Sequence, residues 1–390
     1  CVTGLTTVDT ATYWSPFGQA VIAAGIVVGG LGVMTLASIL GFAVSRHLGL
    51  TQRMLATQET GTGAMGQISL LLKAVIATSL TMQALLAAMF LPRFLSMGID
   101  PVRAVWDSVF MAISVFNNAG FVILPEGLSP HVTDWWMLIP IILGTTVGAI
   151  GFPVIMDVAK NLRTPRRWRL HTKLTLSTYL ILAFVGALAL ALTEWNNPAT
   201  LGAIDTPSKI LNAMLAGVNS RSSGLSALDV GAMRSQTHFV QDILMMIGGG
   251  SASTAGGVKV TTFAVLALAV IAEARGDRDI ETFGRRIPTS AVRLAVAVSL
   301  LGLALVAVSV VLLLSMTNYS LDIILFETAS AFATVGLSTG ITPALPVGAK
   351  YVLIFLMFAG RTGSMTVAAA LALRERSRVI RMPEERPIIG

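Results

Sequence analysis

The chain has 390 residues, of which 54% are hydrophobic and only 12% are charged, with a net charge of +7. A soluble domain carries about 25% charged residues. The composition therefore excludes a soluble protein, and it excludes a nucleic-acid-binding module, because the basic residues punctuate long apolar runs instead of gathering on one polar face. One cysteine, Cys1, excludes a disulfide framework and a cysteine-rich metal site. We expect the protein to lie in a lipid bilayer.

Seven segments are apolar enough to cross a hydrocarbon core of ~30 Å, which takes about 20 helical residues. In chain order they cover residues 17–45, 68–91, 135–156, 174–193, 243–272, 294–317 and 351–373. The fifth segment and the last each contain a single charge at depth, Lys259 and Arg361. An ionisable residue inside a membrane is by default the sign of a functional site.

Three apolar segments between these spans are too short to cross, since ~13 helical residues reach only about 20 Å. They cover residues 104–116, 208–218 and 321–333, and each is followed by small residues and a glycine. A short helix with an irregular return predicts a re-entrant loop, which is tolerated at membrane depth only where it is buried or lines a cavity. Surface amphipathic helices are the alternative for any one of the three.

A repeat favours the re-entrant loops. The segment Val2-Thr3-Gly4-Leu5 is similar to the three loops that follow the short helices, and Gly4, Gly120, Gly224 and Gly336 are separated by 116, 104 and 112 residues. Self-similarity at a nearly fixed period marks a repeat architecture. We predict an all-α integral membrane protein in which four span–short helix–loop–span units surround one central pore. The predicted units are residues 1–66, 67–170, 171–288 and 289–390.

The first unit lacks its first span and nearly all of its short helix. The chain begins on Cys1 instead of Met, three residues before the first repeated glycine. We therefore expect the sequence to be truncated at its N-terminus. Most of the Lys and Arg residues fall in the segments on one side of the predicted spans, which places that side in the cytoplasm.

Four equivalent loops around an axis can present rings of backbone carbonyls, which is how a protein replaces the hydration shell of potassium. Glycine suits such loops because inward-facing carbonyls require backbone angles that a side chain disfavours. The alternative is that each glycine is an ordinary turn residue. The predicted selectivity-filter residues are Val2, Thr3, Gly4, Asn118, Ala119, Gly120, Ser222, Ser223, Gly224, Thr334, Val335 and Gly336.

The Gly-rich stretch 248–257 interrupts the fifth span, and five glycines in ten residues do not make a stable helix, since each costs ~1 kcal/mol relative to alanine. A phosphate-binding loop is a weak alternative, because the Walker pattern requires Gly-Lys-[Ser/Thr] and here Lys259 follows Val258. A packing kink is the other alternative. The stretch predicts an intramembrane gate loop. The predicted gate residues are Gly248, Gly249, Gly250, Ser251, Ser253, Thr254, Gly256, Gly257, Lys259 and Arg361.

The four loops, the Gly-rich break and the tail 383–390 resemble those of the membrane subunits in the Trk/Ktr/HKT potassium transporter superfamily, with TrkH and KtrB most similar. The resemblance implies four M1–P-loop–M2 repeats with filter glycines at Gly4, Gly120, Gly224 and Gly336. It implies a loop at 248–257 that blocks the pore until it moves. Members with a serine at the first glycine carry sodium. With Gly4 there, potassium is the expected ion, and sodium remains open as a coupling or regulatory ion.

The same resemblance implies partners and a location. Resemblance to the bacterial TrkH and KtrB members implies a homodimer in the bacterial cytoplasmic membrane, regulated by a cytosolic RCK-type nucleotide-binding subunit. The basic tail and the loop 275–293 are the expected docking surfaces for that subunit.

Two further charged sites follow from the residues. Arg361, facing the pore, would add an electrostatic barrier below the filter. Arg221 lies three residues before Gly224 and would repel cations if it faced the filter, so we expect it to point away and to need a counter-charge. Asp107 and Glu327 in the short helices are the available carboxylates, and we predict that one of them pairs with Arg221 to brace the filter.

The predicted function is potassium uptake through a gated, carbonyl-lined filter. An unrelated secondary cation transporter with broken helices and a midplane site is the alternative, but it would show two inverted halves. A membrane-embedded enzyme would need a catalytic constellation at depth, and no span places an acidic or histidine partner beside Lys259 or Arg361. The stretch Gly29-Gly30-Leu31-Gly32 lies in a charge-free span and predicts close helix packing.

Overall fold

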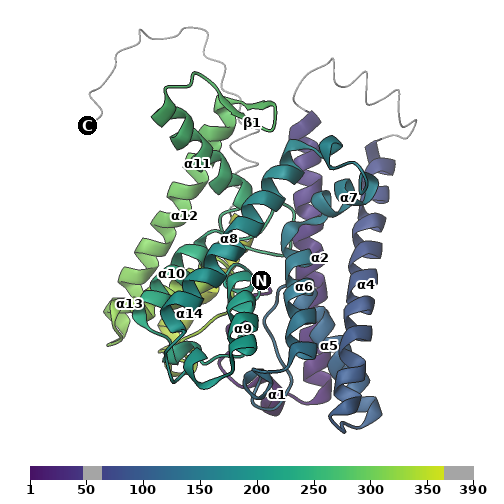
Figure 1. The fold of residues 1–390 in the computed structure, drawn as a ribbon, viewed down its shortest axis with the longest axis vertical. Helices are drawn as coiled ribbons and strands as arrows, with labels where there is room; N and C mark the ends of the chain where they lie inside the picture. The colour runs from purple at the N-terminus through teal and green to yellow at the C-terminus, as the bar shows by residue number, and fades with distance from the viewer. Residues whose placement is uncertain (47–63, 364–390) are drawn as a thin grey trace.

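The computed structural model describes residues 1–46 and 64–363. Upright helices form the body of the molecule (Figure 1). In chain order they are α1 (Thr10–Tyr13), α2 (Pro16–Arg46), α4 (Ala64–Ser96), α5 (Pro101–Phe116), α6 (Trp135–Ile150), α7 (Phe152–Lys160), α8 (Leu170–Glu194), α9 (Thr206–Asn219), α10 (Ser235–Met246), α11 (Val260–Arg275), α12 (Thr289–Met316), α13 (Leu321–Phe332) and α14 (Val347–Phe358). A π-helical turn, Ala359–Gly363, continues α14.

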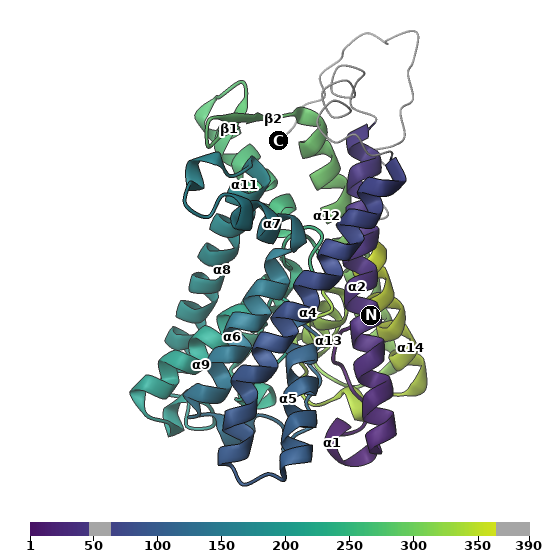
Figure 2. The same ribbon diagram turned by 90° about the vertical axis from the view of Figure 1, so that its right-hand side faces the viewer.

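The described strands, β1 (Ile280–Thr282) and β2 (Arg285–Ile287), pair antiparallel as a small hairpin. Figure 2 shows this hairpin and α7 at the same end of the molecule, with α1 at the opposite end. The end that carries the hairpin is the one that the distribution of basic residues predicts to face the cytoplasm.

Three described helices are long and apolar enough to cross a membrane: α4 over Leu72–Ser96, α8 and α12. These confirm the spans expected at 68–91, 174–193 and 294–317. α8 exposes Leu180, Ile181 and Phe184 while it buries Tyr179 and Leu182. A helix that is hydrophobic on its exposed face as well as its buried one is typical of a membrane span.

The span expected at 135–156 is wrong as one continuous helix. α6 ends at Ile150, and α7 starts after Gly151 at an angle of 96° to it, so that the two make a broken span. Gly151 has φ +92°, a conformation that a side chain disfavours, and Pro153 lies in the first turn of α7. The Gly-Phe-Pro sequence therefore ends one helix and starts another.

Two other expected spans also differ from single helices. The segment 243–272 is divided into α10 and α11 by the irregular residues 247–259. The segment 351–373 is α14 and its π-helical turn as far as Gly363, and residues 364–373 lie outside the described part of the chain. The span expected at 17–45 is the helix α2.

The three short helices are confirmed as α5, α9 and α13. Asp100 and Asp205 cap α5 and α9 with their carboxylates, and Pro101 and Pro207 lie in the first turns. An aspartate cap followed by proline is a strong helix start. The hydrogen bonds from Ser208 hold the pKa of Asp205 below its usual value. The caps explain why these helices begin where they do, at the end of the molecule opposite the hairpin.

Candidate functional site

The four repeated glycines meet in the middle of the molecule and form a closed ring. A Cβ built on Gly4 would lie 2.5 Å from the carbonyl oxygen of Ala119, and a Cβ on Gly120 would lie 2.6 Å from that of Ser223. The other two contacts are closer still, from Gly224 to the carbonyl oxygen of Val335 and from Gly336 to that of Thr3. Each loop thus touches the next with no room for a side chain, and the fourth loop touches the first.

The backbone of these loops is left-handed at the glycines, with φ between +63° and +95°. Three of the loops have a second left-handed residue two positions earlier: Val2 at +58°, Asn118 at +55° and Thr334 at +51°. A left-handed residue thus stands on each side of Thr3, Ala119 and Val335, a conformation that ordinary side chains disfavour. The three loops therefore share one unusual backbone conformation.

The loops are held by side chains of their own short helices. The hydroxyl of Ser114 donates to the carbonyl oxygen of Phe121 at 2.7 Å, and the amide of Asn219 donates to that of Leu225 at 2.6 Å. In the last loop the hydroxyl of Ser330 accepts from the backbone N–H of Gly336 at 3.1 Å. One polar side chain, five or six residues before the glycine, therefore clamps each of these loops.

Three buried side-chain oxygens lie two residues before the glycines. They are Oδ1 of Asn118, Oγ of Ser222 and Oγ1 of Thr334, and each lacks a hydrogen-bond partner among the described residues. Val2 holds the equivalent position in the first loop. Buried oxygens of this kind normally find a partner, so these three, together with the unpaired hydroxyls of Thr3 and Ser223 among the described residues of the four loops, are free to bind a further group. Hard cations take oxygen ligands of this kind.

Glycines in the spans let the helices approach the loops closely. A Cβ on Gly29 would lie 2.6 Å from the side chain of Val2, and Gly30 lies against the side chain of Asn117. Gly148 and Gly360 lie in the same way against the last carbonyls of two short helices. The predicted close packing at Gly29-Gly30-Leu31-Gly32 is confirmed at its first two glycines.

The irregular residues 247–259 fold into a hairpin-like loop, which we call the intramembrane loop. An isolated parallel bridge joins Ile247 to Val258, and the N–H of Gly248 donates to the carbonyl oxygen of Val258 at 2.8 Å. Inside the loop, Ser253 donates to the carbonyl oxygen of Gly250 and Lys259 to that of Ala255, both at 2.6 Å. Side chains of the loop itself therefore satisfy part of its freed backbone.

The tip of the intramembrane loop contacts two of the glycine loops. The amide of Asn118 donates to the hydroxyl of Thr254 at 2.5 Å, and a Cβ on Gly256 would meet the hydroxyl of Thr334. Arg361 reaches the same tip from the π-helical turn and donates to the carbonyl oxygen of Thr254. The structure thus gathers five of the predicted gate and filter residues at one place.

The predicted ion pair of Arg221 is wrong. Its guanidinium is fully buried and lies over the ring of Tyr179, with 3.7 Å between the guanidinium carbon and the ring centroid. Asp107 instead pairs with Arg103 at 2.9 Å, and Glu327 accepts hydrogen bonds from Ser338, Thr339 and Thr342. An aromatic face therefore holds the charge where a carboxylate was expected.

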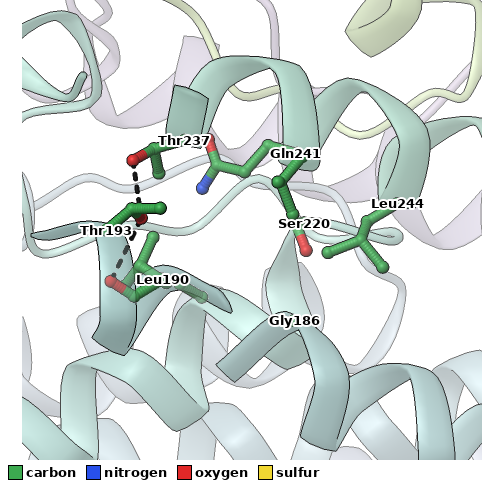
Figure 3. A pocket seen from close by; sticks show the side chains of 9 residues that line it. Gly186, Leu190, Thr193, Ser220, Thr237, Gln241 and Leu244 are labelled. Atoms are coloured by element: carbon green, nitrogen blue, oxygen red, sulfur yellow. Dashed lines mark hydrogen bonds between the residues drawn. The ribbon is translucent and has the colours of Figure 1, made fainter. Parts of the chain in front are cut away.

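Sequence reasoning missed Tyr179, although its signal was present. It is the sole tyrosine in the span 174–193. A buried tyrosine in the middle of an apolar helix usually contacts a polar or charged group. Near it, a cavity of about 10 Å³ lies between α8, α9 and α10, with room for about one water molecule. Figure 3 shows Ser220 and Gln241 at this cavity, beside the hydrogen bond from Thr237 to Thr193.

Sequence comparison places these features in a known family. The TrkH family, described as cation transport protein, matches residues 1–380. The chain belongs to the TrkH family. It is therefore a multi-pass membrane transporter, not an enzyme, and the resemblance seen in its loops is confirmed.

Relatives and a solved structure agree. The chain is 38% identical to the Ktr system potassium uptake protein B of Bacillus subtilis and 32% identical to the protein of that name in Vibrio alginolyticus, covering all of this chain and 87% and 85% of the relatives. It is 32% identical to the potassium/sodium uptake protein NtpJ of Enterococcus hirae, again over the whole chain and 87% of the relative.

The potassium transporter TrkH of Vibrio parahaemolyticus has the same fold, with a TM-score of 0.71 at 16% identity over 96% of this chain and 75% of that one. The predicted fold class, an all-α membrane protein with four pseudo-symmetric repeats around one pore, is confirmed.

Proposed function

We propose that this chain takes up potassium across the bacterial cytoplasmic membrane through a pore whose filter is the ring of four glycine loops. The observation that carries the proposal is the closed set of contacts in which Gly4, Gly120, Gly224 and Gly336 each meet the carbonyl of the neighbouring loop. Rings of carbonyls replace the hydration shell of potassium. The names of the Bacillus and Vibrio relatives, potassium uptake proteins, support the same ion.

The proposed filter is made of four loop segments with different sequences, which we call its strands although they are not β-strands. Its residues are Val2 to Gly4, Asn118 to Gly120, Ser222 to Gly224 and Thr334 to Gly336, each strand in its own repeat as divided at residues 66, 170 and 288. Because the ligands differ from strand to strand, we expect weaker discrimination against sodium than in a channel with four identical strands. The name of the Enterococcus relative, a potassium/sodium uptake protein, is in keeping with that expectation and with sodium as a second ion.

The intramembrane loop is the proposed gate. Its tip meets Asn118 and Thr334 of two glycine loops, and Arg361 donates a hydrogen bond to the same tip. The glycines of this segment give it no helical preference of its own, and it is held by backbone and side-chain hydrogen bonds within the loop and to its neighbours. Its displacement breaks these bonds but does not require a helix to unwind.

Regulation then comes from outside the chain. We propose a homodimer whose cytoplasmic face, at the loop 275–293 and the basic tail, binds an RCK-type nucleotide-binding subunit. The β1–β2 hairpin lies in that loop and exposes Arg285 and Arg286. The tail lies outside the described residues.

Expression in a bacterium that lacks its own potassium uptake systems tests the function. We expect the protein to restore growth at low external potassium and to carry ⁸⁶Rb⁺ into proteoliposomes. Absence of both, with the protein present in the membrane, would contradict the proposal. The alternative, a secondary transporter, would instead show uptake that depends on the gradient of a coupling ion and stops when that gradient is collapsed.

A further inference from the structure

The two polar atoms of the Asn118 side chain have different surroundings. Its Nδ2 donates to Thr254 of the intramembrane loop at 2.5 Å. Its Oδ1 is buried and has no hydrogen-bond partner among the residues that the structure describes. Because the amide is planar, the hydrogen bond from Nδ2 also fixes the direction of Oδ1. The direction of Oδ1 therefore depends on the position of the intramembrane loop. We call the level of Asn118, Ser222 and Thr334, two residues before the glycines, the base of the ring.

The backbone of Asn118 extends this link into the ring itself. Asn118 is left-handed, with φ +55°, which costs an ordinary residue energy unless its surroundings hold it. The next residue, Ala119, supplies the carbonyl that meets Gly4. A change at the Asn118 side chain thus acts one peptide unit away from a carbonyl of the proposed filter.

Thr254 is the point at which the loop is fastened. Its hydroxyl is 3.0 Å from the carbonyl oxygen of Gly148, its N–H donates to the same oxygen at 3.3 Å, and its own carbonyl accepts from Arg361. The loop meets the fourth strand differently, since Gly256 only packs against Thr334. Among the described contacts between this tip and the ring, the hydrogen bond is the one from Asn118 in the second strand, and the contact with the fourth strand is packing.

We propose that Asn118 is a positioning residue that couples ion binding at the base of the filter to the seated position of the gate loop. The proposal rests on the function proposed above and goes beyond it: potassium in the filter and the loop in its seat stabilise one another. Coupling of this kind is reciprocal. Loosening the loop must weaken the resting protein's affinity for potassium, and potassium must in turn favour the seated loop.

Thr254→Val tests the coupling, because it removes the hydroxyl and keeps the shape, and Thr254→Ser is the matched control that keeps the hydroxyl. Two quantities are measured on the purified protein: ⁸⁶Rb⁺ flux into proteoliposomes, and the potassium concentration that gives half of the maximal protection against thermal unfolding, with choline as the inert cation. We expect Thr254→Val to raise both by about 10-fold, because it removes the hydrogen bond from Asn118 and the one to Gly148, and we expect Thr254→Ser to match the wild type.

The outcomes separate the coupling from the function. If Thr254→Val raises flux and leaves the half-protecting concentration unchanged, the loop is a plug without coupling and the inference is overturned, while the proposed function stands. If the wild type carries no ⁸⁶Rb⁺, the proposed function fails first. Asn118→Leu combined with Thr254→Val adds a second measurement: effects on flux smaller than the product of the two single effects support the coupling, and multiplicative effects overturn it.

Discussion

The guanidinium carbon of Arg221 lies 3.7 Å from the centroid of the Tyr179 ring, and both side chains are fully buried. Arg221 belongs to the loop that ends in Gly224, whereas Tyr179 belongs to the middle of α8. The contact thus fixes a loop of the ring to the span behind it. A ring face attracts a desolvated cation by about 2 kcal/mol, and it does so without placing a carboxylate beside the proposed filter.

Replacing Tyr179 tests that contact. Tyr179→Leu removes the ring face and leaves a buried charge uncompensated, so we expect a loss of about 2–4 kcal/mol in stability. Tyr179→Phe keeps the face and is expected to stay close to the wild type. Thermal unfolding of the purified protein in detergent measures the difference. Equal destabilisation by both variants would show that the ring does not hold Arg221.

The sequence sufficed for the short helices and for the glycines, because both rest on local signals. Asp100-Pro101 and Asp205-Thr206-Pro207 combine a capping carboxylate with a proline in the first turn, which favours a helix start, and the period of the glycines follows the repeat. The partner of Arg221 was not predictable in the same way. Carboxylates are the usual partners of buried arginine, and the contact with Tyr179 depends on how α8 packs behind the third loop, which no local pattern states.

The break after Ile150 had a signal that the hydropathy of the span concealed. Gly151-Phe152-Pro153 combines a residue that tolerates left-handed backbone with one that starts helices. Hydropathy alone joins α6 to α7, since both are apolar, although the chain turns by 96° between them. Gly151 and Pro153 thus indicate the helix break, which the length of the apolar segment does not.

A second prediction concerns the closure of the ring. Gly336→Ala would place a methyl group against the carbonyl oxygen of Thr3, whereas Gly340→Ala, at a nearly equal φ of +92°, meets open space. Both changes cost about 1–2 kcal/mol for left-handed backbone, but only the first displaces a carbonyl of the proposed filter. We expect Gly336→Ala to abolish ⁸⁶Rb⁺ uptake and Gly340→Ala to retain it. Equal loss in both would point to backbone strain instead.

A third prediction compares the two carboxylates of the short helices. Glu327 is fully buried and accepts from Ser338 at 2.5 Å and from the N–H of Thr339 and the hydroxyl of Thr342 at 3.0 Å each. An amide cannot accept this set at both of its atoms, so Glu327→Gln is expected to cost about 1–3 kcal/mol and to loosen the fourth loop.

Asp107→Asn is the matched control for that change. The partner of Asp107, Arg103, is 39% exposed, and an ion pair with one exposed member contributes little. We expect a small effect on thermal unfolding and normal uptake. A larger loss from Asp107→Asn than from Glu327→Gln would reverse the assignment of which carboxylate supports its loop.

A fourth prediction concerns the fastening of the gate. Arg361 donates to the carbonyl oxygen of Thr254, and a hydrogen bond from a charged donor contributes about 1.5–3 kcal/mol. Arg361→Gln is therefore expected to raise ⁸⁶Rb⁺ flux about tenfold or more by releasing the loop. Lys259→Met, which removes a bond within the loop to Ala255, is expected to raise it less. Unchanged flux in Arg361→Gln would refute the role of Arg361 as a fastener.

The last prediction follows from the one strand that lacks an oxygen at the base of the ring. Val2 occupies the position that Asn118, Ser222 and Thr334 fill with unpaired oxygens, and its φ of +58° matches theirs in two of the three cases. Val2→Thr adds a hydroxyl of similar shape and completes the set. We expect the potassium concentration that half-protects against thermal unfolding to fall about 2- to 5-fold, the effect of one added ligand bond of ordinary strength. Val2→Ala, which adds no oxygen, serves as the control and is expected not to lower it. If Val2→Thr leaves the half-protecting concentration unchanged or raises it, a side-chain oxygen at this position does not bind potassium.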